Sequence, residues 1–197
     1  MFCKKIKSIS NYDNRRRNLE QKIDEINAME VDEEMKNNMR KNLETLETYG
    51  PPAYDAVIIS EMGTRLVEIV SLMAYYDLNS ENSFIVGMSG WDSLEDAREN
   101  VFNGTYYVSN INNESKNYDT KYFNIFSKKP NKINYITHDL FIILEKLSLF
   151  EPPQGESEIS FEGTLGKTSV GKDSISREIL FKKFKNGVSQ IENICKL

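Results

Sequence analysis

The sequence contains few of the residues that build disulfide frameworks and metal sites. Its 197 residues include two cysteines, one histidine and one tryptophan. Because Cys3 and Cys195 lie near opposite ends of the chain, we expect two free thiols rather than a disulfide framework. A structural zinc site needs clustered Cys and His ligands, which this sequence does not offer. We therefore expect no metal and no cofactor.

The chain also lacks an excess of positive charge and any long apolar run. It carries 25 Lys and Arg against 30 Asp and Glu, a net charge of −5, whereas a nucleic-acid-binding surface needs clustered, excess Lys and Arg. Its apolar runs are too short to span a membrane. The start, MFCKKIKSIS, is basic but is not followed by the apolar stretch of a secretory signal. These features are typical of a globular domain with neither a nucleic-acid partner nor a transmembrane segment.

Charge and apolar spacing set residues 1–50 apart from the rest. They hold 10 Lys and Arg and 10 Asp and Glu. Apolar side chains recur at helical spacing in two runs, Leu19, Ile23 and Ile26, then Met35, Met39, Leu43 and Leu46. Asp32 is placed to cap the second run. We expect two amphipathic helices, or one long helix with a defect, that act as a partner-binding arm or pack as a hairpin on their own domain.

From Ala53 the pattern changes to strands that alternate with helices. We expect strands at 56–60, 83–89 and 104–110, and helices at 63–76, 92–102, 118–127 and 137–150, the last capped by Thr137. The first run, AVIIS, is typical of a strand buried on both faces of a parallel sheet. This alternation predicts an α/β fold, a three-layer lobe with a mostly parallel sheet of about four to six strands. The first three strands should be adjacent and parallel.

A polar break at 151–158 separates this lobe from the C-terminal segment. The following GTLGKTS (163–169) is similar to a phosphate-binding loop, but Phe161 stands where that loop needs a glycine, so we expect only a glycine-rich turn. The pair Asn186-Gly187 predicts a β-hairpin. The expected domains are a charged helical arm (1–50), an α/β lobe (51–150), and a linker with a C-terminal β-hairpin (151–197).

Polar residues follow the first two predicted strands, where each leads into a helix. In an open parallel sheet the C-terminal strand ends face helix N-termini, and ligands, anions in particular, bind there. The candidate ligand-binding residues are Glu61, Thr64, Ser89, Trp91 and Asp92. We expect a half-exposed Trp91 to serve as a lid or stacking surface. The alternative is that Trp91 and Met88 pack under a loop.

The only histidine, His138, stands beside Asp139 at the start of an apolar helix. Such a pair is a candidate general base with its orienting carboxylate. However, adjacent residues of a helix do not face each other, and the sequence has no nucleophile motif such as GxSxG. Solvation or capping at the helix start explains the pair better. We assign no catalytic residue, expect no hydrogen-bonded group of His138, Ser89 and Asp92, and predict a protein that is not an enzyme.

The stretch YDAVIISEMGTRLVEIVSLMAYYDLNSENSFIVGMSGWD (54–92) resembles the C-terminal lobe of type 1 periplasmic binding proteins of the leucine/isoleucine/valine-binding kind. It looks most similar to the bacterial branch called penicillin-binding-protein activators. There, as here, a charged helical stretch like YDNRRRNLEQ precedes LETLETYGPPAYDAVIIS. The segments LMAYYDL, GMSGWD and ENVFNGTYYVSN also match. The resemblance covers about residues 10 to 150.

The resemblance implies a non-enzymatic domain that binds a small polar ligand such as an amino acid, as in amino acid transport. The family has two lobes around a ligand cleft, and this chain holds one lobe. The resemblance therefore implies a partial chain whose first lobe is missing. The alternative is a cell-envelope interaction module that stimulates a peptidoglycan synthase, which should expose a large apolar patch. The implied location is the periplasm or cell envelope, with cytoplasmic retention as the alternative because no signal segment is seen.

Overall fold

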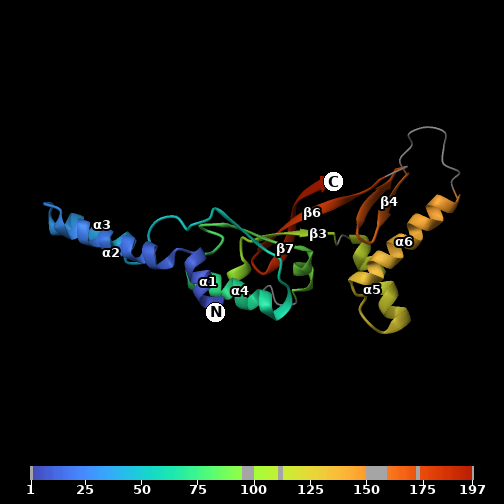
Figure 1. Cartoon of the computed structure of the whole chain (residues 1–197), viewed down its shortest axis with the longest axis horizontal. Coiled ribbons are helices and arrows are strands. Elements are labelled where there is room, and N and C mark those ends of the chain that lie inside the picture. Colours follow the sequence, from blue (N-terminus) through green and yellow to red (C-terminus); the bar gives the residue numbers. More distant parts are fainter. Residues whose placement is uncertain (1, 95–99, 111–112, 150–158, 172–173, 197) are drawn as a thin grey trace. The chain divides into compact units, whose positions relative to one another are not determined.

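The chain is described by a computed structural model that covers residues 2–94, 100–110, 113–149, 159–171 and 174–196 (Figure 1). The fold divides into two compact units. Unit 1 comprises Met1–Tyr106 and Phe184–Val188, and unit 2 comprises Tyr107–Lys183 and Ser189–Leu197.

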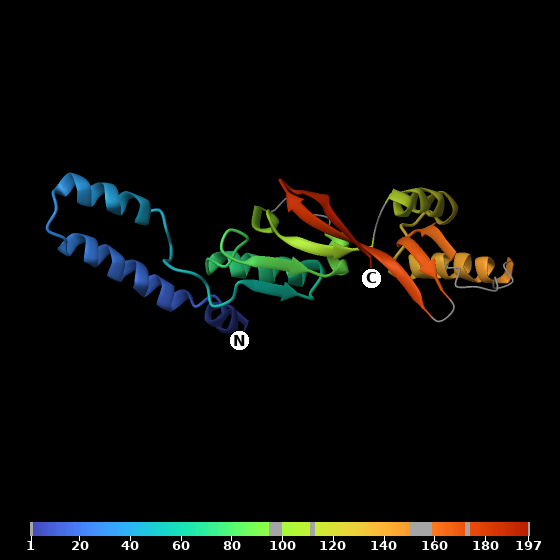
Figure 2. The same cartoon turned by 90° about the horizontal axis from the view of Figure 1, so that it is seen from above.

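Unit 1 begins with three helices, α1 (Phe2–Ile9), α2 (Tyr12–Ala28) and α3 (Glu33–Leu43). Helices α2 and α3 lie side by side as a hairpin (Figure 2). The carboxylate of Asp32 accepts a hydrogen bond of 2.7 Å from the Met35 amide and caps α3. The predicted pair of helices and the predicted cap are therefore confirmed, whereas α1 was not predicted. We call residues 1–50 the helical arm.

The α/β part of unit 1 follows the predicted order. Strand β1 (Ala56–Ile59) and strand β2 (Phe84–Gly87) pair in parallel, and helix α4 (Gly63–Tyr75) connects them. Strand β3 (Tyr106–Ser109) begins at Tyr106, the last residue of this part of unit 1. The apolar face of α4 is buried, as its spacing predicted: Leu66, Ile69, Val70 and Met73. The α/β fold class is therefore confirmed, as is the parallel pairing of the first two strands.

Strand β1 is not buried on both faces, which corrects the interpretation of AVIIS. It is the first strand of the sheet, with β2 as its neighbour. Successive side chains of a strand point to opposite faces. The face with Ile59 and Ile85 is buried, whereas Ile58 on the other face is 73% exposed and Phe84 is also exposed. The continuous apolar run therefore belongs to a strand, β1, that is covered on only one of its two faces.

The predicted helix over 92–102 is not a single α-helix in the described residues. Its two ends form 3-10 helices, η1 (Ser89–Ser93) and η2 (Asn100–Phe102), and residues 95–99 lie outside the described part. Asp92 therefore lies inside η1 instead of opening a helix. After η2, Gly104 and Thr105 exchange backbone hydrogen bonds of 2.8 and 3.0 Å with Phe184, which brings this part of β6 into unit 1.

Unit 2 combines two helices with antiparallel strands. Its elements are α5 (Asn113–Phe126), α6 (Lys132–Leu149), β4 (Ile159–Gly163), β5 (Gly166–Val170), β6 (Ile175–Lys185) and β7 (Val188–Lys196). Strand β5 pairs antiparallel with both β4 and β6, and β7 pairs with β6. With the parallel β1–β2 pair of unit 1, the strand pairing of the chain is mixed.

Two turn predictions for the C-terminal segment are confirmed. The GTLGKTS stretch forms the turn between β4 and β5 and the start of β5. Asn186 and Gly187 join β6 to β7 with φ angles of 53° and 76°. Positive φ at both positions is what a type I′ hairpin turn requires.

The start of α6 was predicted incorrectly. The helix begins at Lys132, and Thr137 lies inside it. Asn131 and Asn134 cap the helix reciprocally: the Asn134 amide donates to Asn131 Oδ1 at 3.1 Å, and the Asn131 amide donates to Asn134 Oδ1 at 2.8 Å. This exchange satisfies donors at the helix start, so Thr137 is not needed as a cap. The prediction of free thiols at Cys3 and Cys195 falls on side chains outside the described ones.

Candidate functional site

The candidate site is the edge of unit 1 where β1 and β2 end. Helix α4 begins there at Gly63, whose φ of 61° lies in the left-handed region that favours glycine. A Cβ atom placed on Gly63 would meet no atom within 4 Å. Met62 precedes the helix, and its side chain makes no capping hydrogen bond. Residues 62–65 are all exposed, so the N-terminal end of α4 is open to solvent, where an anion can reach its amides.

The loops after the two strands touch each other. A Cβ atom on Gly90 would lie 3.1 Å from Met62 Cβ, which places the 88–92 loop, which contains most of η1, against the 60–62 loop before α4. This contact brings Glu61 and Thr64 to the same edge as Ser89. Glu61 Oε1 lies 3.6 Å from Arg65 Nε, so the edge carries both signs of charge. The structure thus groups the polar candidates, and their contact with a ligand stays a prediction.

Trp91 is buried instead of half exposed, which corrects the expected lid. Only 1% of the residue is exposed, and its ring lies 5.7 Å from the Phe102 ring and 6.4 Å from the Phe184 ring, centroid to centroid. A Cβ atom on Gly87 would lie 2.1 Å from the indole, so the ring packs directly on the end of β2. The alternative interpretation, packing under the loop, holds for Trp91, whereas Met88 is exposed.

Asp139 of unit 2 is a structural residue. Its buried carboxylate accepts hydrogen bonds of 2.7 Å from both the amide and the hydroxyl of Thr164, and one of 3.1 Å from the Leu165 amide. His138 Nδ1 lies 3.6 Å from Asp139 Oδ1, which is too long for a hydrogen bond. Asp139 therefore ties α6 to the β4–β5 turn. Solvation or capping at a helix start, the role expected for His138 and Asp139, is therefore wrong for Asp139. Its carboxylate binds the amides of the β4–β5 turn instead.

The Tyr118 ring of α5 packs against His138. The Tyr118 ring lies 4.5 Å from the His138 ring and 5.5 Å from the Tyr135 ring, centroid to centroid. Burial raises the pKa of the Tyr118 phenol, which donates a hydrogen bond of 3.4 Å to the Asn134 carbonyl. Tyr118 is therefore a neutral hydrogen-bond donor at neutral pH, and its position favours a packing role over acid–base chemistry.

Sequence reasoning missed a second buried charge, Arg15 on α2. Its guanidinium donates to the Gly50 carbonyl at 2.8 Å, and to the carbonyl and the carboxylate of Asp77 at 2.9 Å each. The Thr48 hydroxyl donates to the same carboxylate. Asp77 follows α4, so these bonds fasten the helical arm to the α/β part of unit 1. No local pattern identifies Arg15, because its charged partner is 62 residues away in sequence.

Comparisons with known proteins place the fold. No protein-family model and no curated protein matches this sequence. An extracellular ligand-binding receptor from Desulfohalobium retbaense is similar in structure, with a TM-score of 0.50 over 71% of this chain at 18% identity. This chain therefore has an α/β fold similar to part of that receptor. A leucine-binding protein, LivK from Thermotoga maritima, gives a TM-score of 0.45 over 83% of this chain at 15% identity.

The chain spans only part of these receptors, 26% of the first and 48% of the second. The likeness to the Desulfohalobium retbaense receptor confirms the predicted α/β fold and nothing finer. The closer resemblance to penicillin-binding-protein activators stays a prediction. Within the described ranges, we find no helix that combines the length and the apolar character needed to cross a membrane.

Proposed function

We propose that this chain is a non-enzymatic binding lobe for a small polar ligand with a carboxylate, such as an amino acid. The observation that carries the proposal is the open N-terminal end of α4 at Gly63, next to a touching loop from the neighbouring parallel strand. Amide N–H groups and the helix dipole favour a ligand carboxylate. The Glu61 carboxylate suits an ammonium group, while Thr64 and Ser89 offer hydroxyls.

The proposed site is one-sided. Sites for drug-sized ligands bury ~70–90% of the ligand surface, which a single strand-end edge does not provide. The chain matches 26% of the receptor from Desulfohalobium retbaense, so most of that protein has no counterpart here. A second lobe, supplied by another segment or another chain, would close over the edge and complete the ligand shell.

Exposed apolar side chains on unit 2 favour a second candidate function, a protein-interaction module. On α6, Ile143 is buried but Leu140 and Leu144 are half exposed, and the side chain of Leu147 lies outside the described ones. Large exposed apolar residues of α5 and α6 are Phe123, Ile125, Phe126, Ile133, Ile136, Leu140, Phe141 and Leu144. Under this candidate function, the face packs against the missing first lobe or an envelope protein. The predicted activator resemblance would make that envelope protein a peptidoglycan synthase.

Isothermal titration calorimetry tests the one-sided site. We expect the purified 197-residue chain to bind free amino acids with a dissociation constant no better than ~1 mM, or about −4 kcal/mol, because one lobe makes only part of the contacts. The panel should contain branched, polar and acidic amino acids. Micromolar binding of any of them by the monomer would show that the chain holds a complete site.

A further inference from the structure

Charge is segregated along the helical arm. We call residues 24–34 its tip; they hold no Lys or Arg and six acidic residues, Asp24, Glu25, Glu30, Asp32, Glu33 and Glu34. The other arm residues, 1–23 and 35–50, hold ten Lys and Arg against four Asp and Glu, a net charge of +6. Six of these cations lie in α1 and the first turns of α2: Lys4, Lys5, Lys7, Arg15, Arg16 and Arg17. We call residues 4–17 the base of the arm.

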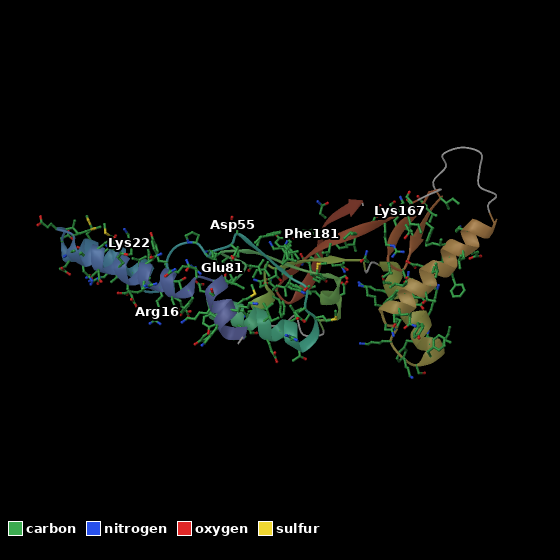
Figure 3. The ribbon with its side chains drawn as sticks, in the orientation of Figure 1. Arg16, Lys22, Asp55, Glu81, Lys167 and Phe181 are labelled. Atoms are coloured by element: carbon green, nitrogen blue, oxygen red, sulfur yellow. The ribbon has the colours of Figure 1, made fainter. Side chains whose placement is uncertain are left out.

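Contacts within the chain neutralise only part of this charge. Arg15 pairs with Asp77, Lys22 with Glu25 at 2.9 Å, and Lys36 with Glu33 at 3.4 Å. At the base, Lys7 pairs with Asp13 at 2.6 Å, and Arg16 lies 3.7 Å from Glu20. At the tip, Asp24, Glu30 and Glu34 have no ion-pair partner among the described residues, and the same holds for Lys4 and Lys5 at the base. Figure 3 labels Arg16 and Lys22 on the arm, where their side chains are exposed and partly exposed, respectively. Opposite charges therefore stay available at the two ends of the arm.

The arm also exposes apolar side chains. Helix α3 buries none of its residues, and Met35 and Met39, one turn apart, are 46% and 40% exposed. At the tip, Met29 and Val31 are exposed as well. An amphipathic helix normally covers its apolar stripe. The tip thus combines exposed apolar side chains with exposed carboxylates.

Two open hollows at and next to the base complement this tip. One, of about 400 Å³, is lined by Leu19, Ile23, Leu46 and two tyrosines, with Arg16, Glu20 and Glu47 at the same hollow. The other, of about 500 Å³, is lined by three cations, Lys4, Lys7 and Arg17, by the Asp13 carboxylate and by uncharged polar residues. The first hollow offers apolar surface to the exposed apolar side chains of the tip, and the second, with three cations against one carboxylate, offers positive charge to its acidic ones.

We propose that two copies of this chain form a two-fold dimer through antiparallel helical arms, with the acidic tip of each copy docked on the basic base of the other. Met29 and Val31 enter the apolar hollow of the partner, and Glu30 and Glu34 face its Lys4 and Arg17. A two-fold axis makes each contact twice, which suits a surface that carries both complementary halves. The acidic tip disfavours nucleic acid or an anionic lipid surface as the occupant, since like charges repel. This dimer is independent of the proposed ligand site.

Charge-swap variants test the dimer by sedimentation velocity on the 197-residue chain. The base variant carries Lys4→Glu, Arg16→Glu and Arg17→Glu, and the tip variant carries Asp24→Lys, Glu30→Lys and Glu34→Lys. Each variant alone meets like charge across the interface, so we expect its dimerisation constant to weaken at least ~10-fold against wild type. Mixed in equal amounts, the two variants regain opposite charges and should form a heterodimer. High salt should weaken the wild-type dimer, because exposed charges are screened.

Three results would overturn the proposal. The first is a wild-type chain that stays monomeric up to ~500 µM. The second is a wild-type dimer that neither variant weakens, and the third is a pair of monomeric variants that do not associate on mixing. The matched control reverses the charge of two exposed lysines outside the arm, with Lys121→Glu in α5 and Lys128→Glu just after it. This control should leave the dimer unchanged. If circular dichroism shows that a charge variant does not fold, Met29→Ser with Val31→Ser replaces it. A dimer unaffected by that apolar pair also contradicts the proposal.

Discussion

Replacing Arg15 with methionine is expected to lower the free energy of unfolding of unit 1 by ~3 kcal/mol. The Arg15 side chain is only 4% exposed and makes three hydrogen bonds. Two of them join the arm to Asp77, and the third holds Gly50 at the end of the arm. Methionine keeps the apolar stem but leaves the Asp77 carboxylate without its cation. Loss of one partner of a buried ion pair is costly, because the other partner stays desolvated and uncompensated.

Trp91 provides the measurement for this variant. It is the only tryptophan of the chain and is buried in unit 1, so its fluorescence during urea unfolding reports on that unit. The matched control is Arg16→Met, one residue away, where the guanidinium is exposed and faces Glu20 at 3.7 Å. An exposed pair of this kind contributes little, so the control should change stability by less than ~1 kcal/mol. Equal stability of the two variants would contradict the structural role of Arg15.

The second large effect is expected in unit 2, where Asp139→Asn should cost ~3 kcal/mol. Asp139 accepts hydrogen bonds on both carboxylate oxygens, from Thr164 and from the Leu165 amide. An asparagine has only one acceptor oxygen, so its NH₂ group must face one of these donors. The substitution also removes the negative charge that lies 3.6 Å from Arg177 Nη2.

Amide hydrogen exchange measured by NMR spectroscopy checks the Asp139 prediction. Protection of the Thr164 and Leu165 amides should fall ~100-fold in Asp139→Asn, as a loss of ~3 kcal/mol implies. The matched control, Glu162→Gln, makes the same carboxylate-to-amide change at an exposed position of the neighbouring strand β4. It should leave the protection of both amides within about threefold of wild type. Unchanged protection in Asp139→Asn would contradict the proposed tie between α6 and the turn.

The sequence predicted the features of this fold that depend on local pattern. The spacing of Leu66, Ile69, Val70 and Met73 defined α4, and Asn186-Gly187 defined the hairpin turn. Asp32 identified the start of α3, because a cap bonds within its own first turn. The candidate edge was predicted in the same way, since parallel strands joined by a helix end on one side of a sheet.

Features that depend on distant partners could not be predicted. An arginine in a charged helix is usually solvated, and the buried state of Arg15 follows only from Asp77 at the far end of α4. The sequence suggested that Asp139 acts with its neighbour His138. The amides that donate hydrogen bonds to Asp139 instead lie 25 and 26 residues away in the sequence. Trp91 was predicted to be a lid because it follows a predicted strand. In the structure its ring packs against Phe102 and Phe184. The apolar run of β1 predicted that the strand packs in a sheet. It did not predict how many faces of the strand are covered.

Backbone NMR spectra of the 197-residue chain titrated with amino acids test the central claim most directly, because amide shifts detect weak binding and locate it. The account predicts shifts that saturate in the millimolar range and cluster at the start of α4 (residues 62–66) and in the 88–92 loop. Shifts in those amides should be reduced by Thr64→Val and unchanged by Thr45→Val, a matched change on the exposed surface of the arm. The absence of any shift at the strand-end edge, or shifts confined to another surface, would contradict the assignment of this edge as the ligand site.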